Sequence, residues 1–90
     1  MEFRQSFGLA VRIFRERRHW RQEDLARAAG ITRAYVSRIE SGAVGLGIDT
    51  QRRIAEALGV ELSELMAQAE EEQERRRKRL GLEGSEDPRA

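Results

Sequence analysis

Apolar residues along the chain recur with the spacing of α-helices, and no stretch alternates with the period of a β-strand. Phe7, Ala10, Val11 and Phe14 stand at positions i, i+3, i+4 and i+7, so that one face of a helix is apolar. This spacing predicts a first helix over residues 6–18, with Ser6 as its N-cap.

Glycines and capping residues mark the ends of the helices that follow. Gly30 and Gly42 stand where a helix ends in a left-handed residue, and Thr32 offers a side-chain oxygen to the first amides of a helix. Asp49 opens another helix, which buries Ile54, Ala57 and Leu58 and stops at Gly59. The predicted helices after the first cover residues 22–29, 33–41 and 49–58, followed by a fifth that begins near residues 61–63.

The fifth helix changes character along its length. Its first turns carry an apolar stripe that is longer than one small core needs, and we expect it to contribute to a dimer interface. This stripe consists of Leu62, Leu65, Met66 and Ala69. After residue 68, acidic residues precede basic ones at i, i+4 spacing, an order that stabilises a solvated helix. These pairs are Glu71 with Arg75, Glu72 with Arg76 and Glu74 with Lys78.

The change of character suggests two parts of the chain. We predict one domain over residues 1–67 and a charged helical extension with a disordered tail over residues 68–90. The extension is most simply a self-stabilised helix, and its alternative role is a surface that binds a protein partner.

Composition limits the chemistry available. Ninety residues suffice for one small core, and the chain has no cysteine and one histidine. Disulfides, thiolate nucleophiles and zinc–thiolate sites are thereby excluded, and we expect no metal and no cofactor. No nucleophile–base pair or phosphate-cradling glycine loop occurs, so we do not expect an enzyme. We also expect a cytoplasmic protein without membrane contact, because neither a signal peptide nor a spanning apolar run is found.

Charge is unevenly distributed although the net charge is only +1. Residues 1–42 contain nine arginines and five acidic residues, whereas the rest of the chain is acidic on balance. A positive half of this kind suits a polyanionic partner. Sixteen of the seventeen basic residues are arginine, which binds phosphate and guanine edges well, although a GC-rich coding sequence produces the same bias.

The most informative stretch covers residues 22–41, where two short helices flank a turn of three to four residues. Such a pair crosses steeply, which requires a small residue at the crossing, Ala26, and a permissive one in the turn, Gly30. Apolar residues at the required spacing lock the pair to the core; they are Leu25, Ile31, Val36 and Ile39. The outward face of the second helix then carries short polar residues and two arginines, a surface able to enter a major groove.

This stretch resembles the phage-repressor/Cro-type (XRE) helix-turn-helix family, and within it the small controller proteins of restriction–modification systems. The resemblance covers about residues 7–66. It is carried by Gln22, Glu23, Asp24, Leu25, Ala26, Gly30, Ile31, Thr32, Tyr35, Val36, Ser37, Ile39, Glu40 and Gly42, and later by Ile54, Ala55, Ala57, Leu58, Gly59 and Val60. It implies an all-α, five-helix, lambda-repressor-like domain with an extended charged C-terminal helix. It also implies a transcriptional regulator that binds a pseudo-palindromic operator in double-stranded DNA as a homodimer.

The resemblance assigns roles to particular residues. The positions that contact bases are Arg33, Ala34, Ser37 and Arg38. Gln22 matches a glutamine that binds a phosphate, and the expected backbone contacts are Gln22, Arg21, Thr32, Tyr35 and Arg18. Arg15 and Glu40 match a partly buried ion pair that ties the first helix to the third.

The sequence also departs from the family pattern. Arg21 stands where Ser or Thr commonly caps the helix, and the loop over residues 43–47 lacks the basic residue that relatives use against the DNA backbone. A different class of function therefore remains open, in which the protein is an antitoxin or interaction module whose C-terminal helix binds a protein partner.

Overall fold

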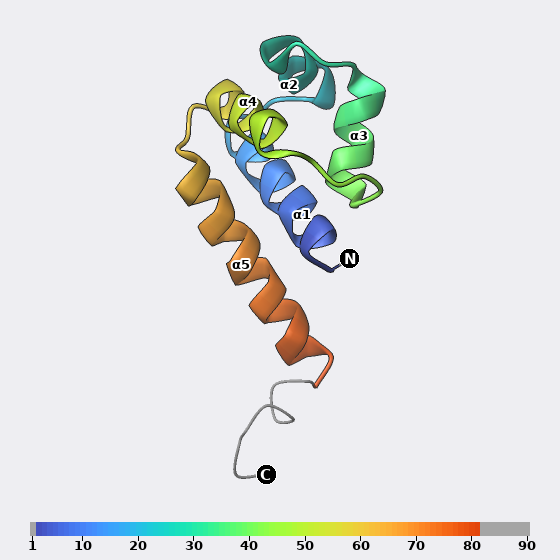
Figure 1. Ribbon diagram of the computed structural model, residues 1–90, viewed down its shortest axis with the longest axis vertical. Coiled ribbons are helices and arrows are strands. Elements are labelled where there is room, and N and C mark those ends of the chain that lie inside the picture. Colours follow the sequence, from blue (N-terminus) through green and yellow to red (C-terminus); the bar gives the residue numbers. More distant parts are fainter. Residues whose placement is uncertain (1, 82–90) are drawn as a thin grey trace.

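Five α-helices form at the five places that the apolar spacing predicts, which confirms the all-α fold (Figure 1). The computed structural model describes residues 2–81, and no strand occurs within that range. The helices are α1 (Glu2–Arg17), α2 (Gln22–Ala29), α3 (Arg33–Ser41), α4 (Ile48–Leu58) and α5 (Leu62–Arg79). None of them is long and apolar enough to cross a bilayer.

The first helix begins four residues earlier than predicted, so the assignment of Ser6 as its N-cap is wrong. Ser6 is buried inside α1, on the face that packs against the rest of the domain. The earlier start follows from Phe3, which stands four residues before Phe7 and extends the apolar stripe by one turn. The two rings lie 6.1 Å apart between centroids, a favourable separation for an aromatic pair.

The ends of α2 and α3 follow the predicted signals. Gly30 and Gly42 adopt left-handed backbone angles, with φ of 71° and 79°, which residues with a Cβ rarely adopt. Thr32 caps α3, because its hydroxyl oxygen accepts a hydrogen bond from the Tyr35 amide at 3.1 Å. Three residues therefore suffice to turn the chain from α2 into α3.

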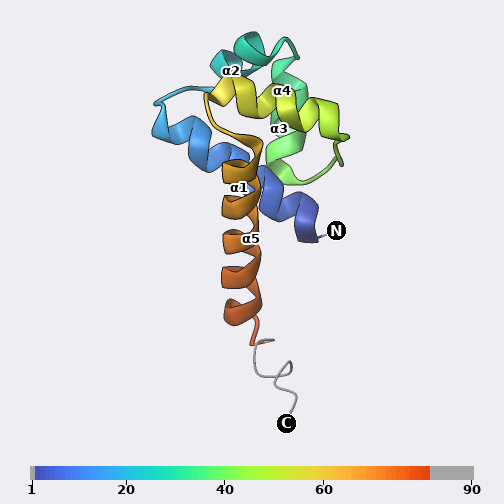
Figure 2. The same ribbon diagram turned by 60° about the vertical axis from the view of Figure 1, so that its left-hand side comes forward.

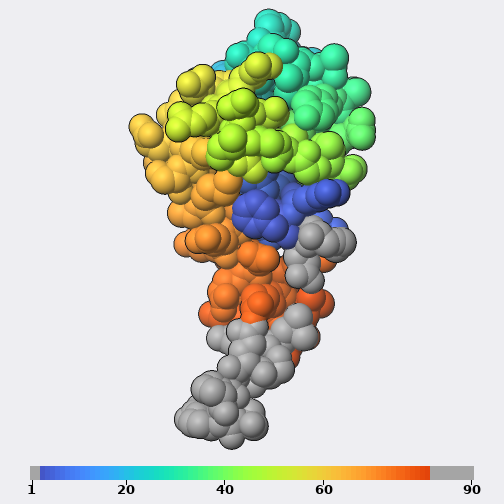
Figure 3. Space-filling model, in the orientation of Figure 1, coloured from blue at the N-terminus to red at the C-terminus, as the bar shows by residue number. Residues whose placement is uncertain are grey.

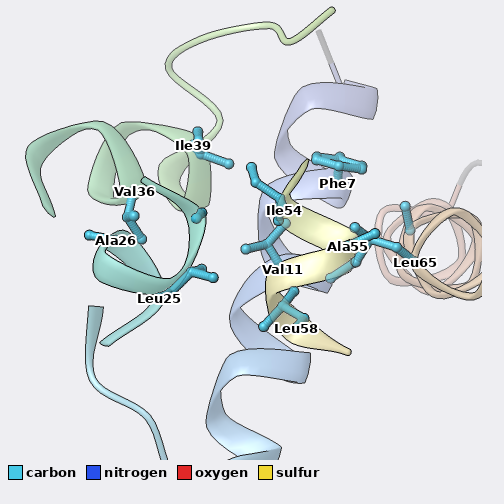
Figure 4. Close-up of a cluster of buried hydrophobic side chains, with 13 residues drawn as sticks. Phe7, Val11, Leu25, Ala26, Val36, Ile39, Ile54, Ala55, Leu58 and Leu65 are labelled. Carbon is cyan, nitrogen blue, oxygen red and sulfur yellow. The ribbon is translucent and has the colours of Figure 1, made fainter. Parts of the chain in front are cut away.

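The core lies where the first four helices meet and where α5 covers one side of them (Figure 4). Its largest fully buried side chains are Leu25, Ile54, Leu58, Leu65, Val11 and Val36. The sequence pattern predicts that Ala57 of α4 is buried, and this prediction is wrong. Ala55 is the buried alanine, and Ala57 is only partly buried. On α4, Ala55 points toward Leu65 of α5, so the face of α4 that carries Ala55 is the one turned to α5 (Figure 4).

The last helix packs mainly on α1 and then continues past it. In both ribbon views the C-terminal half of α5 projects beyond the other helices (Figures 1 and 2). The predicted boundary between residues 67 and 68 falls in the middle of this unbroken helix, and Ala69 beyond it is fully buried. Of the predicted disordered tail, residues 82–90 lie outside the described residues.

The ion pairs of Arg75 on α5 differ from those that the spacing predicts. Arg75 contacts both Glu71, at 3.6 Å, and Glu72. Glu72 also accepts a hydrogen bond from Gln68 at 2.8 Å, so it does not pair with Arg76. The i, i+3 contact of Arg75 with Glu72 has replaced the expected i, i+4 contact.

Candidate nucleic-acid interface

The second and third helices form a steeply crossed pair at one end of the molecule, while α5 projects at the other end (Figures 1 and 3). Buried residues on the inner faces hold the pair to the core, Leu25 and Ala26 from α2 and Val36 and Ile39 from α3. Because these faces are fixed, the remaining face of α3 is turned to solvent.

That outer face carries every residue predicted to contact bases. Arg33, Ala34, Ser37 and Arg38 are all exposed, whereas Val36 and Ile39 of the same helix are buried. The backbone candidates differ from one another. Arg21 and Thr32 are exposed, whereas Tyr35 is half-buried and packs against the core.

One acidic side chain lies beside this face. Glu23, in the first turn of α2, approaches Arg33 at 3.9 Å, and the side chains are 46% and 65% exposed. At this distance and exposure the pair is weak, so Arg33 is free to exchange Glu23 for another acceptor.

A buried ion pair joins α1 to α3, at the positions that the resemblance implies. The Arg15 guanidinium donates to both carboxylate oxygens of Glu40, at 2.6 and 3.0 Å, and also to the Trp20 carbonyl at 2.6 Å. The hydrogen bond to Glu40 is the main cause that raises the pKa of Arg15 above its ordinary value. The two side chains are only 10% and 5% exposed, so the pair is shielded from solvent and salt.

The same carboxylate also binds a residue that the resemblance assigns to a backbone contact. The side-chain amide of Gln22 donates to Glu40 at 3.1 Å. Gln22 therefore stands at the N-terminus of α2 in an orientation set by the ion pair. Sequence spacing gave no sign of this contact, because the two residues are 18 positions apart.

The close approach of α1 to α3 depends on Gly8, which no pattern in the sequence marks. A Cβ on Gly8 would stand 2.2 Å from the Ile39 carbonyl oxygen and 2.8 Å from that of Glu40. These are backbone atoms, which cannot move aside as a flexible side chain can. The absence of a side chain at Gly8 thus fixes how closely the outward-facing helix sits on its support.

The start of α2 is capped from within the helix. Arg21 provides no side-chain cap, but its amide donates to the Asp24 carboxylate at 2.8 Å. This hydrogen bond is the main cause that lowers the pKa of Asp24 below its ordinary value. The Arg21 side chain is 74% exposed and lies 3.7 Å from the Asp24 carboxylate, a weak surface pair that leaves Arg21 able to exchange partners.

Arg18 has a place within the fold. Its guanidinium donates to the Leu58 carbonyl at 3.2 Å and lies 4.3 Å from the centre of the Trp20 ring. The hydrogen bond ties the end of α1 to the end of α4, and the ring contact lies within the loop between α1 and α2. Arg18 therefore makes its contacts inside the domain, whereas the Arg21 side chain lies mostly in solvent and pairs with Asp24.

The predicted dimer stripe needs correction. Leu65 and Ala69 are completely buried within the single chain, where α5 packs on the core, so they are not available to a second chain. Leu62 and Met66 are partly buried and retain exposed surface. The periodicity located the apolar face of α5 correctly but could not tell which surface would cover it.

The described residues contain no group of three or more histidine, cysteine or acidic side chains able to hold a metal ion. The exposed residues of the α2–α3 region include arginine and hydroxyl donors, among them Arg21, Thr32, Arg33, Ser37 and Arg38. These are groups that bind phosphate oxygens and the edges of bases.

Comparisons with known proteins agree with this geometry. The model of the helix-turn-helix family HTH_3 matches residues 11–65, which is more than half of the chain. The chain is 33% identical over 70 residues to a protein described as a Neisseria hypothetical transcription factor, from Neisseria meningitidis serogroup B. The match covers 78% of this chain and spans 66% of the length of that relative.

Two solved structures are similar. The restriction-modification controller protein C.AhdI from Aeromonas hydrophila is 33% identical, with a TM-score of 0.66 over 68% of this chain and 92% of that one. The clp gene regulator ClgR from Corynebacterium glutamicum has a TM-score of 0.85 over 89% of this chain and 85% of that one. At 22% identity, the likeness to ClgR concerns the fold alone.

Proposed function

The chain belongs to the helix-turn-helix family of DNA-binding transcription regulators, and on that basis we propose that it binds a pseudo-palindromic operator as a homodimer. Each copy places α3 in a major groove of double-stranded DNA. Arg33, Ala34, Ser37 and Arg38 contact bases, and Gln22, Arg21 and Thr32 contact the sugar–phosphate backbone.

One observation carries the proposal. All four side chains of the base-contacting set are exposed on α3, while buried apolar residues of the same helix and the Arg15–Glu40 pair hold it to the core. A helix held in this way can enter a groove without rearranging the core. Its exposed arginines match the acceptor atoms of guanine, and each bidentate contact is worth about 1–3 kcal/mol of discrimination.

The homodimer follows from the expected symmetry of the operator. Two recognition helices meet two half-sites when their centres are about 34–36 Å apart, one turn of B-DNA. Leu62 and Met66 are the members of the α5 stripe that can contribute to the contact between copies.

The relatives' descriptions as a transcription factor and as a controller protein support the proposed regulatory function. Such a protein works where the chromosome is, which in a bacterium is the cytoplasm.

A selection from a random-sequence duplex pool tests the proposal. We expect the protein to enrich a two-fold symmetric sequence and its affinity to fall steeply with salt, because phosphate contacts release counterions. Arg38→Ala should relax the preference at one position of each half-site, whereas Gln22→Ala should weaken binding to all sequences alike. Equal losses on every sequence from both variants would contradict the assigned roles.

A second function is favoured by the projecting half of α5, which reaches past the domain and leaves Leu80 57% exposed. In this alternative the extension binds a protein partner, as in an antitoxin. A chain ending after Glu74 keeps every buried residue and discriminates between the two. Unchanged operator binding and dimerisation in this chain would assign the extension to a partner.

A further inference from the structure

A polar recess lies beside the outward face of α3, where three helices meet. It has a volume of about 320 Å³, and its walls come from α1, from the start of α2 and from α3. The lining residues are Arg12, Arg15, Gln22, Ser37, Glu40 and Ser41. Two of these, Ser37 and Gln22, belong to the sets proposed to contact bases and backbone, so the recess adjoins the DNA-facing surface.

The charges at the floor of the recess cancel. Arg15 and Glu40 are buried and bonded to each other, which leaves neither available for a ligand. The Ser41 hydroxyl donates to the Arg38 carbonyl, and Ser37 is exposed. Arg12 is therefore the cation at this recess that can turn to an incoming group.

Arg12 is held only at the surface. Its Nε donates to Glu16 at 3.1 Å, one turn further along α1, and the side chains are 57% and 54% exposed. Such a pair is worth little in water. Glu16 also lies 3.9 Å from Arg15, so its carboxylate keeps a cationic neighbour when Arg12 leaves it.

We propose that this recess holds one phosphodiester of the DNA backbone and that Arg12 is the residue that binds it, a site that depends on the proposed DNA-binding function. The backbone strands border the major groove, so a helix lying in the groove brings its flanks against phosphates. The guanidinium of Arg12 offers paired N–H donors to phosphate oxygens. The Gln22 amide and the Ser37 hydroxyl stand on the other walls of the same recess.

This assignment means that Glu16 weakens DNA binding, whereas Arg12 strengthens it. In the free protein Glu16 competes with the phosphate for Arg12, so that removing its charge should tighten binding to DNA. A residue that only stabilised α1 would not have this effect. The pair Arg12 and Glu16 therefore provides two variants with opposite expected outcomes at one site.

The test measures the affinity of the full chain for a random-sequence duplex of about 30 base pairs, close to three helical turns, across a salt series. Arg12→Gln should weaken binding about three- to tenfold and lower the slope of log affinity against log salt by about one. Glu16→Gln should strengthen binding by a similar factor. Thermal melting of each variant verifies that the fold is retained.

Two control variants make the same changes in charge away from the recess. Arg53→Gln and Glu56→Gln alter exposed residues of α4, which contributes nothing to the recess walls. Larger effects at Arg12 and Glu16 than at these controls support the site. If Arg12→Gln and Arg53→Gln have equal effects, or Glu16→Gln binds no tighter than Glu56→Gln, the site is wrong although the protein binds DNA. If the unaltered chain binds no duplex, the proposed function itself fails.

Discussion

The arginine–glutamate pairs in two regions of this protein have different surroundings. Between α1 and α3, Arg15 and Glu40 are almost completely buried, and their hydrogen bonds extend to the Trp20 carbonyl and to Gln22. On the C-terminal half of α5, Arg75 pairs with two neighbours on its own helix. The side chains of Arg75 and Glu71 are 58% and 64% exposed, whereas that of Glu72 is 9% exposed.

The two regions show that an arginine and a glutamate contribute differently to stability according to how deeply they are buried. Removing one member of a buried pair leaves a charge without partner or solvent, which is costly. An exposed pair gains little, because water and salt already screen both charges. The interface between α1 and α3 is consequently expected to be sensitive to substitution, and the charged half of α5 to be tolerant.

The largest effect is expected when the buried pair loses one member. Arg15→Ala leaves the Glu40 carboxylate buried without its cation, and the free energy of unfolding should fall by about 3–5 kcal/mol. Chemical denaturation followed by circular dichroism measures this change. Arg12→Ala on the same helix is the matched control, because its exposed pair with Glu16 is worth at most about 1 kcal/mol. Equal losses in the two variants would contradict the comparison.

A smaller loss is expected when the backbones of α1 and α3 are pushed apart. Gly8→Ala places a methyl group against the Ile39 carbonyl, which should cost about 1–3 kcal/mol of stability. The control is Gly47→Ala, because a Cβ at Gly47 would meet nothing within 4 Å. Comparison of the two denaturation midpoints checks the prediction, and a Gly8 variant as stable as the Gly47 variant would disprove close packing at this point.

The cap of α2 is an intermediate case and depends on pH. The pKa of Asp24 is lowered in the folded chain, so its carboxylate stabilises the fold above the unfolded pKa, near 4, and this contribution is lost as pH falls through the folded pKa. Asp24→Asn should therefore lower stability at neutral pH and lose less stability on acidification than the unaltered chain. Denaturation midpoints measured at neutral pH and at about pH 3 test this. Parallel pH dependences in the two proteins would argue against the cap.

The smallest effect is expected on α5. Arg75→Gln removes the cation from Glu71, which is exposed, and from Glu72, which is only 9% exposed but keeps its hydrogen bond from Gln68. Because the Arg75 side chain itself is 58% exposed, we expect a loss of stability of at most about 1 kcal/mol that shrinks at about 1 M salt. Thermal melting at low and high salt measures it. A loss comparable with that of Arg15→Ala would mean that the projecting half of α5 is part of the cooperative fold.

Much of the recognition region was predictable because its signals are local. Gly30, Thr32 and Gly42 fix the ends of α2 and α3, and the predicted bounds of both helices agree with the structure. The exposed set on α3 follows from the buried positions Val36 and Ile39, since one face of a helix determines the other. The resemblance, rather than spacing, supplied the pairing of Arg15 with Glu40.

Other features required the folded arrangement. The spacing on α5 could not reveal that Leu65 and Ala69 face the chain's own core rather than a second copy. Ser6 looked like a cap because serine is common there, but tertiary packing buried it. The recess with Arg12 joins three helices, and the close contact at Gly8 joins backbones about 30 residues apart, so neither leaves a pattern along the sequence.

The exposed face of α3 has a practical consequence for retargeting. Arg33, Ala34, Ser37 and Arg38 touch solvent, while the helix that carries them is anchored by Val36, Ile39 and Glu40 on its other side. If α3 reads bases as proposed, a combinatorial library at those four positions would vary the sequences that the protein selects without altering the scaffold that presents them. The exposed residues proposed to select the DNA sequence are different from the residues that hold α3 in place. The protein is therefore a starting point for engineered regulators with new target sequences.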